Sequence, residues 1–283
     1  STNRTRRRWA SPPRAAAPPW GCALLRAADL SFAYGPAPVL RGVSMEVPAK
    51  GFVGILGPNG SGKTTLLKML AGLLEPSGGH VLLEGSDLRR MPRPALARRM
   101  AVVPQETRLA FDYRVMEVVL MGRYPHLGTF EIEGPADFAA AREALAATGT
   151  LFLEDRPFGT LSGGEKQRVI IAAALAQIAG AQGDGILLLD EPTVALDLAY
   201  QLELADLLQD LQRRLPIAIA ISTHDLNFAA HVCQSVVLLR SGEVLARGET
   251  AEVLTPAGIR ALYGVEADVS RHAASGPLAI LPP

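Results

Sequence analysis

The chain has 283 residues, and its 28 lysines and arginines are balanced by 28 aspartates and glutamates. This length is enough for one large domain or two lobes, while the even charge gives no indication of a nucleic acid or an anionic membrane as partner. Two cysteines are too few for a disulfide framework or a zinc site, and the longest apolar runs fall far short of the roughly 20 residues of a membrane-spanning helix.

Residues 1–22 are rich in arginine and proline and contain no acidic residue. The prolines interrupt any apolar stretch that a signal peptide would need, so the composition predicts a disordered tail. An arm that touches lipid or nucleic acid is the alternative for this tail. The folded part is expected to span residues 23–265, followed by a loose C-terminal tail over 266–283.

Short apolar runs alternate with helical patterns along the folded part, which is typical of an α/β fold. The runs at 186–190 and 217–223 are apolar throughout, as in parallel strands covered on both faces. Residues 106–180 read as mainly helical and predict a helical insertion inside the α/β core. The segment 235–248 has a Ser-Gly turn between two strand-like runs and predicts a β-hairpin, with a helical segment following it to Tyr263. Further strands are predicted at 51–56, 81–85 and 100–105, with a helix after the first of them.

The stretch GPNGSGKTT at 57–65 follows an apolar strand and opens a helix, which is the setting of a phosphate-binding P-loop. Its glycines let backbone N–H groups turn towards phosphate oxygens, Lys63 supplies a positive charge, and the Thr64 hydroxyl is a ligand for Mg²⁺. The nucleotide-binding residues predicted here are Gly57, Pro58, Asn59, Gly60, Ser61, Gly62, Lys63, Thr64 and Thr65.

The run ILLLDEP at 186–192 ends an apolar strand with two adjacent acids. Asp190 is placed to face Mg²⁺, and Glu191 points elsewhere and is placed to orient or deprotonate the attacking water. Phosphoryl transfer needs these two tasks performed by separate groups. Alone this pattern is weak, because acids often end strands, but a P-loop upstream makes the catalytic interpretation the better one.

Three further side chains are candidates. Two of them stand at the ends of strands, and ligands of open α/β sheets bind beyond the carboxyl ends of the strands. His224 follows 217–223 and could donate to a γ-phosphate oxygen. Gln105 ends the strand predicted at 100–105 and could bind Mg²⁺ or the attacking water. Tyr34 offers a flat ring for adenine, although it could equally be an ordinary strand aromatic.

The stretch LSGGE at 161–165 places a serine and two glycines before a strongly helical run, a pattern suited to holding an anion at a helix N-terminus. Together with the P-loop and LLLDEP, it makes residues 24–265 resemble the ATP-binding cassette family. The resemblance identifies Tyr34 with the A-loop aromatic, Gln105 with the Q-loop, 195–197 with the D-loop and His224 with the switch histidine. It also identifies LLLDEP with the Walker B motif. It implies a RecA-like sheet, an antiparallel β subdomain and a helical subdomain between the Q-loop and Walker B.

In that family two cassettes associate head to tail, so the resemblance implies that Ser162, Gly163 and Gly164 cap the ATP bound to the P-loop of a second copy. ATP and Mg²⁺ are the expected ligands, with Thr64, Gln105 and Asp190 on the metal. The segment after Gln105 resembles cassettes of importers for iron–siderophore, haem or cobalamin.

An importer cassette implies an integral membrane permease at the cytoplasmic face of the inner membrane, an indirectly associated substrate-binding protein, and no nucleic acid. Contact with the permease is expected around 114–126, with Arg123 as one contact residue. The alternative is a soluble ATPase of this class with a regulatory or interaction role and no permease. Neighbouring genes for a permease and a substrate-binding protein would separate the two.

Overall fold

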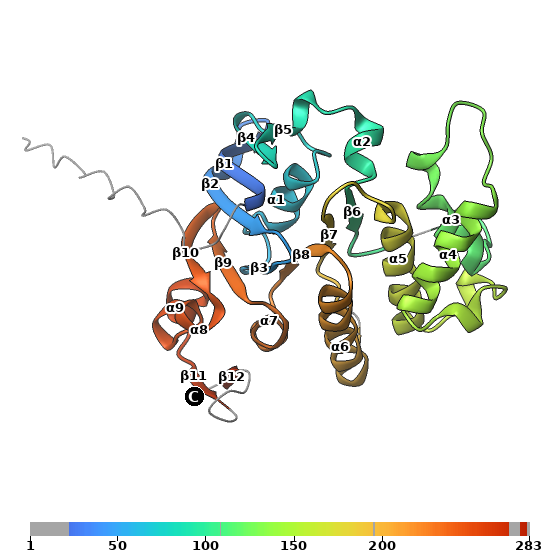
Figure 1. The fold of residues 1–283 in the computed structure, drawn as a ribbon. Helices are drawn as coiled ribbons and strands as arrows, with labels where there is room; N and C mark the ends of the chain where they lie inside the picture. The colour runs from blue at the N-terminus through green and yellow to red at the C-terminus, as the bar shows by residue number, and fades with distance from the viewer. Residues whose placement is uncertain (1–22, 108, 195, 272–277, 282–283) are drawn as a thin grey trace, which may run out of the picture.

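The structure of the chain is a computed structural model that describes residues 23–107, 109–194, 196–271 and 278–281. The predicted disordered tail at 1–22 and Ala195 of the expected D-loop lie outside the described residues. Figure 1 shows two sheets stacked with helices, and a group of helices standing to one side of them.

The central sheet has six strands in the order β10-β9-β3-β8-β7-β6, parallel except for β10, which runs antiparallel to β9. The polar residues that follow β6, β7 and β8 therefore meet at one edge, where the carboxyl ends of parallel strands lie together. The predicted hairpin is confirmed as the β9–β10 pair. The strands are β3 (Phe52–Leu56), β6 (Met100–Val103), β7 (Gly185–Asp190), β8 (Ile217–Thr223), β9 (Ser235–Arg240) and β10 (Glu243–Glu249).

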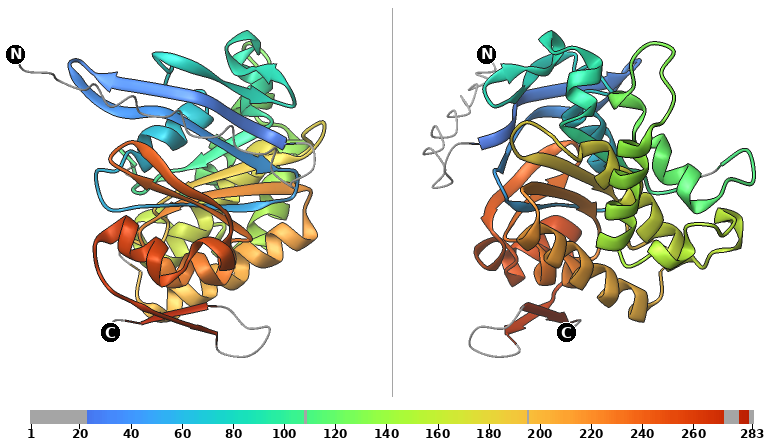
Figure 2. Two further views of the ribbon diagram at one scale, coloured as in Figure 1. Left: turned by 90° about the vertical axis from the view of Figure 1, so that its left-hand side faces the viewer. Right: turned by 45° about the vertical axis from the view of Figure 1, so that its right-hand side comes forward.

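A second, antiparallel sheet has the order β2-β1-β4-β5 and lies over one face of the central sheet (Figures 1 and 2). The helix α1 (Lys63–Leu70) lies between the two sheets, and its buried Leu66 and Leu70 join one apolar core with side chains from both. This core anchors the helix that begins at the P-loop. The remaining elements here are β1 (Ala23–Tyr34), β2 (Ala37–Pro48), β4 (Gly78–Leu83), β5 (Ser86–Asp87), the 3₁₀ helix η1 (Leu88–Arg90) and α2 (Arg93–Ala97).

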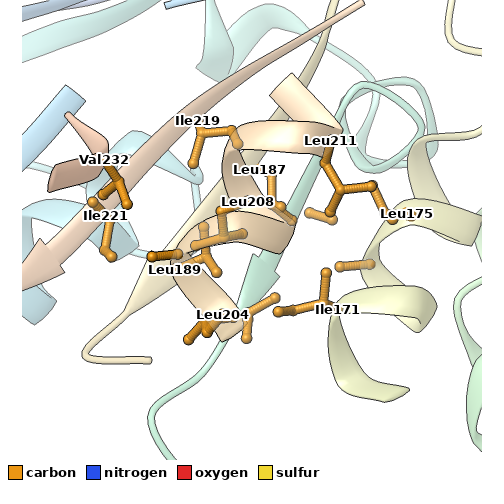
Figure 3. Close-up of a cluster of buried hydrophobic side chains, with 14 of the residues drawn as sticks. Ile171, Leu175, Leu187, Leu189, Leu204, Leu208, Leu211, Ile219, Ile221 and Val232 are labelled. Atoms are coloured by element: carbon orange, nitrogen blue, oxygen red, sulfur yellow. The ribbon is translucent and has the colours of Figure 1, made fainter. Parts of the chain in front are cut away.

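The other face of the central sheet is covered by α5 (Gly163–Ile178), α6 (Leu198–Arg214) and α7 (Leu226–Val232). Successive residues of β7 point to opposite faces: Leu187 and Leu189 pack under these helices, whereas Ile186 and Leu188 pack towards α1 (Figure 3). Burial on both faces is why these strands are apolar throughout, and it confirms the α/β architecture expected from the sequence.

The segment between β6 and β7 is helical and stands beside the central sheet (Figure 1). We call this segment the helical subdomain. It consists of α5 together with α3 (Val115–Met121), η2 (Tyr124–His126), α4 (Pro135–Ala147), η3 (Leu151–Leu153) and η4 (Phe158–Thr160). No helix among the described residues is long and apolar enough to cross a membrane.

The structure contradicts the expectation that Arg123 is a contact residue for a permease. Its guanidinium is buried, with Nε 3.0 Å from Asp137 Oδ1 and Nη1 donating to the carbonyl oxygen of Ala176 at 2.6 Å. Arg123 therefore ties the end of α3 to the start of α4 and to the last turn of α5. Sequence position alone did not reveal this burial, because Asp137 and Ala176 are brought to it by packing.

Charge reversal at this position should unfold the helical subdomain rather than loosen a docking surface. We expect Arg123→Glu to lower the free energy of unfolding by about 3–5 kcal/mol, because a buried pair loses one partner and two carboxylates then face each other. Urea unfolding measures the change. The exposed arginine of the Arg142–Glu154 pair gives the control, because Arg142→Ala should cost at most about 1 kcal/mol. Equal effects of the two variants would contradict the structural role of Arg123.

The C-terminal part of the chain is more ordered than the sequence indicated. After α8 (Thr250–Val253) and α9 (Pro256–Tyr263) come the antiparallel strands β11 (Asp268–Arg271) and β12 (Leu278–Leu281). The Asn227 side chain in α7 donates to the Ile280 carbonyl oxygen at 3.1 Å and accepts from its N–H at 2.8 Å. Part of the expected loose tail is therefore a small sheet bound to α7, at the side of the molecule opposite the four-stranded sheet (Figure 2).

Candidate active site

The predicted P-loop connects β3 to α1, and its glycines are required by the shape of the loop. Gly62 has φ of 103° at the cap of α1, in the left-handed region that side chains disfavour. A Cβ on Gly57 would lie 2.1 Å from the Leu239 carbonyl oxygen of β9, closer than atoms can approach. The loop thus ends at the first turn of α1, and a helix N-terminus favours an anion.

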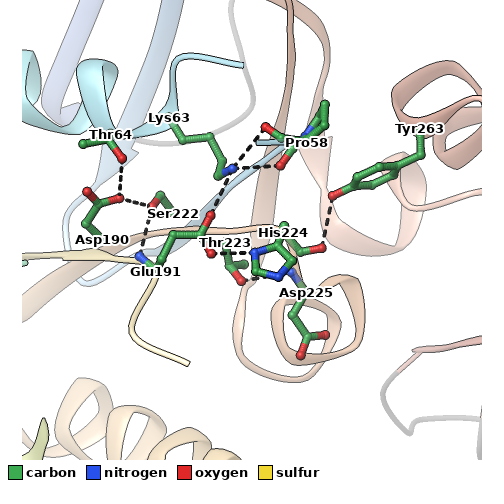
Figure 4. A network of polar contacts seen from close by, with 11 residues as sticks. Pro58, Lys63, Thr64, Asp190, Glu191, Ser222, Thr223, His224, Asp225 and Tyr263 are labelled. Atoms are coloured by element: carbon green, nitrogen blue, oxygen red, sulfur yellow. Dashed lines mark hydrogen bonds and ion pairs between the residues drawn. The ribbon is translucent and has the colours of Figure 1, made fainter. Parts of the chain in front are cut away.

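Lys63 is buried and lies under this loop. Its Nζ donates to the carbonyl oxygens of Gly57 at 2.8 Å and Pro58 at 3.3 Å, and lies 3.0 Å from Glu191 Oε1 (Figure 4). The charge is paired, as a buried ammonium requires. The cation predicted to bind phosphate and the carboxylate predicted to be catalytic are therefore in direct contact.

Asp190 ends β7 and shares one carboxylate oxygen between two hydroxyl groups. Thr64 Oγ1 donates to Oδ1 at 3.0 Å, and Ser222 Oγ donates to the same oxygen at 2.5 Å. Ser222 reaches it because β7 and β8 pair in parallel with Asp190 opposite Ser222. A carboxylate beside a hydroxyl is an oxygen donor set that fits Mg²⁺, which is usually held by one or two carboxylates and substrate phosphates.

Glu191 turns away from Asp190 because its backbone leaves the strand conformation, with φ of 46°. Its N–H donates to the carbonyl oxygen of Ser222 at 3.0 Å, which holds the turn. Its buried carboxylate then has Oε1 on Lys63 and Oε2 2.7 Å from His224 Nδ1 (Figure 4). A positive φ at a non-glycine residue costs energy and is found at functional sites.

A cleft of about 470 Å³ brings most of the predicted site residues together. Gln105 reaches it from the end of β6, Glu191 from the end of β7 and His224 from the end of β8, so all three lie where the strand-end argument placed them. The lining residues are Val39, Asn59, Gly60, Gly62, Lys63, Thr64, Thr65, Gln105, Glu191, Val194 and His224.

Tyr34 does not line this cleft. Its side chain is 56% exposed at the end of β1, edge-on to Phe32 with the ring centroids 4.8 Å apart. Val39 lines the cleft instead, two residues beyond Ala37, the partner of Tyr34 in β2. Tyr34 is therefore close along the β1–β2 hairpin to a residue that lines the cleft, and its contact with adenine stays a prediction.

The segment Ser162–Gly164 does not line the cleft of its own chain either. Ser162 caps α5: its hydroxyl accepts from the N–H of Glu165 at 3.3 Å, and its own N–H donates to that carboxylate at 2.8 Å. Backbone hydrogen bonding pulls the pKa of the Glu165 carboxyl below its usual value. A Cβ on Gly164 would lie 2.4 Å from the Tyr200 ring, so this glycine also has a packing reason.

Three contributors to the site were missed by sequence reasoning. Ser222 binds the Asp190 carboxylate and accepts from the N–H of Glu191 at 3.1 Å. Its position one residue before the end of β8, opposite the end of β7, is the signal that strand register could have provided. Val39 and Val194 have no such signal, because they reach the cleft from β2 and from the turn after Glu191 only in the folded chain.

The chain is similar to known proteins over nearly its whole described length. A sequence profile described as ABC transporter matches residues 40–194, more than half of the 283 residues. The hemin import ATP-binding protein HmuV of Bordetella pertussis is 42% identical over 251 residues, covering 88% of this chain and 95% of that protein. The ferric enterobactin transport ATP-binding protein FepC of Escherichia coli is 36% identical over 260 residues, covering 92% and 94%.

Among solved structures, one described as an inward-facing metal-chelate type ABC transporter superposes with a TM-score of 0.80 at 29% identity. The superposition covers 93% of this chain and 98% of that one. The profile and both relatives include the P-loop and the Asp190–Glu191 pair within their matched span, so this chain belongs to the ABC transporter family and is an ATP-hydrolysing subunit of that family.

Proposed function

We propose that this chain hydrolyses ATP with Glu191 as the residue that orients and deprotonates the attacking water. The observation that carries the proposal is the position of its carboxylate, buried in the cleft between Lys63 and His224. When water attacks the γ-phosphorus, its oxygen forms the new bond, the bond to the β–γ bridging oxygen breaks, and Glu191 takes the proton. His224 holds the carboxylate in place and can donate to a γ-phosphate oxygen.

The P-loop and Lys63 bind the phosphates in this proposal. Thr64 and Asp190 would hold Mg²⁺, with Gln105 as a further candidate ligand from the end of β6. When bound, Mg²⁺ would neutralise charge on the β- and γ-phosphates. The hydroxyl of Ser222 keeps the Asp190 carboxylate aimed at Thr64 through its 2.5 Å hydrogen bond.

We infer that a working site needs two copies of the chain. Ser162 and the backbone N–H groups of Gly163 and Gly164 stand at the start of α5, outside the cleft that holds Lys63. A head-to-tail dimer would bring each such helix N-terminus onto the nucleotide bound by the other copy, where the helix dipole favours a phosphate.

We further propose that the hydrolysis drives import of a metal chelate through a membrane permease at the cytoplasmic face of the inner membrane, served by a substrate-binding protein. Support comes from the printed activities of HmuV and FepC and from the metal-chelate type of the similar transporter structure. Haem and iron–siderophore complexes are the favoured substrates, with cobalamin a further member of the class.

The permease test uses the genes beside the one for this chain. Membrane vesicles containing the chain together with its neighbouring permease should accumulate radiolabelled haem or iron–siderophore only when ATP is present. Vesicles with Glu191→Gln give the control. A complex that forms but takes up neither these two chelates nor cobalamin in the presence of ATP would contradict the substrate class. Absence of any permease gene would favour a regulatory ATPase.

A mixed dimer tests whether the segment Ser162–Gly164 acts on the other copy. We expect a dimer of one Lys63→Ala subunit and one Ser162→Arg subunit to occlude one ATP, half the amount of the unmodified dimer, while neither variant alone occludes any. In the mixed dimer both changes fall in one site, and the other site keeps an intact P-loop facing an intact Ser162. The bulk of arginine blocks closure despite its favourable charge.

The measurement is labelled ATP retained after rapid dilution, because hydrolysis could require both sites to be whole. Each variant carries a different affinity tag, and two successive purifications through the two tags isolate the mixed dimers. If mixed dimers form and retain no ATP, Ser162 acts within its own chain and the arrangement between copies is wrong.

A further inference from the structure

The last helix of the ATPase core reaches the back of the active site through one side chain. Tyr263 is the final residue of α9, and its hydroxyl donates to the backbone carbonyl oxygen of His224 at 3.1 Å. The ring packs against the main apolar core, 39 residues further along the chain than His224. Figure 4 shows the phenol on the side of His224 away from Glu191.

The imidazole of His224 is half exposed, so packing against neighbouring side chains restrains it less than it would a buried residue. It stands alone between the last residue of β8 and Asp225, the residue that caps α7. Asp225 is well held, since its N–H donates to Thr223 Oγ1 at 3.0 Å and its carboxylate accepts from the N–H of Phe228 at 2.9 Å. The Tyr263 hydroxyl provides the corresponding hydrogen bond to the backbone of His224 itself.

The helix that carries Tyr263 is a firm support. Thr255 caps it by accepting from the N–H of Gly258 at 3.1 Å, and Ile259 and Leu262 are buried against the end of the central sheet. Arg240 of β9 donates to the Ala261 carbonyl oxygen in its last turn. A hydroxyl at the end of such a helix is fixed in direction, so it restrains the atom it binds.

The hydroxyl also keeps its proton. Burial, with the negative charges of Glu191 and Asp225, raises the pKa of Tyr263 to about 12. The phenol is therefore a neutral donor throughout the physiological pH range, and the His224 carbonyl keeps its partner whatever the state of the imidazole.

We propose that Tyr263 is a positioning residue for ATP hydrolysis, holding the His224 backbone so that Nδ1 stays on the Glu191 carboxylate. The chain of contacts runs from α9 through Tyr263 to His224 and then to Glu191. It makes the C-terminal helix part of the catalytic apparatus. This inference rests on the roles proposed above for Glu191 and His224.

The first experiment removes only the hydroxyl. We expect Tyr263→Phe to lower kcat for ATP hydrolysis by about 3- to 10-fold, the loss of one hydrogen bond, with KM for ATP and the melting temperature unchanged. Tyr124→Phe, at an exposed tyrosine of η2, is the matched control and should hydrolyse ATP like the parent protein. A raised KM with a lowered melting temperature would assign Tyr263 a merely structural role and overturn the proposal.

A double-mutant cycle shows whether Tyr263 acts through His224. In single-turnover hydrolysis, Tyr263→Phe should cause no further loss when added to His224→Ala. Multiplied losses would mean that Tyr263 acts by another route, which overturns the inference. Unchanged hydrolysis by Tyr263→Phe beside an impaired His224→Ala overturns the inference alone. Unchanged hydrolysis by His224→Ala instead removes the role proposed for His224, and with it the basis of the inference.

Discussion

Replacing Glu191 with glutamine should reduce ATP hydrolysis by at least about 100-fold while ATP binding persists. A positioned general base contributes about 10²–10⁴-fold to a rate, and glutamine keeps the shape of glutamate without its ability to accept a proton. The hydroxyl–carboxylate pair of Thr64 and Asp190 is separate from Glu191 and is untouched by the change. Phosphate release measures turnover, and calorimetry measures ATP affinity.

The affinity of the Glu191→Gln protein for ATP should equal or exceed that of the parent. Glu191 Oε1 lies 3.0 Å from Lys63 Nζ, so the carboxylate competes with phosphate oxygens for the same ammonium group. Loss of that negative charge leaves Lys63 free for the nucleotide. The bound but unhydrolysed ATP should then trap a dimer that elutes earlier in gel filtration.

Glu143→Gln is the matched control, since Glu143 is an exposed glutamate of α4 remote from the cleft. Its hydrolysis rate should equal that of the parent. Hydrolysis by Glu191→Gln within a few-fold of the parent rate would show that another group activates the water. His224 and Gln105, which line the same cleft, would then be the candidates for that group.

Replacing Lys63 with alanine should instead abolish tight binding of ATP. The ammonium is the buried positive charge of the cleft floor, and a hydrogen bond to a charged group contributes about 1.5–3 kcal/mol, so the Kd should rise by about 10- to 100-fold or more. Calorimetry measures this change directly. Because the protein hydrolyses only what it binds, turnover at low ATP should fall with it.

Lys68→Ala is the control for this prediction, because Lys68 is an exposed lysine on the same helix, α1. It should bind ATP with the affinity of the parent. Thermal unfolding of Lys63→Ala must be followed as well, since the change leaves Glu191 buried without its lysine partner. A folded Lys63→Ala protein that binds ATP with full affinity would remove the P-loop assignment.

The parts of this protein that could be predicted from sequence are those whose chemistry lies within a few consecutive residues. The P-loop is a single turn, and the positive φ of Gly62 within it is a local reason for glycine. The strands β7 and β8 are apolar because both of their faces are buried, and that burial is visible in the sequence as an unbroken run of apolar residues. Polar residues ending such strands necessarily meet at one edge, which is why Gln105, Glu191 and His224 could be grouped in advance.

Other features exist only because distant segments pack together. Arg123 looked like a surface charge, and it is buried because Asp137 and Ala176 surround it. Tyr263 reaches His224 across 39 positions, and the strand β12 is held by Asn227 across more than 50. Side-chain burial and hydrogen bonding between such segments depend on how helices settle on the sheet. No local pattern of residues carries that information, so tertiary packing decides which polar side chains support the active site from behind.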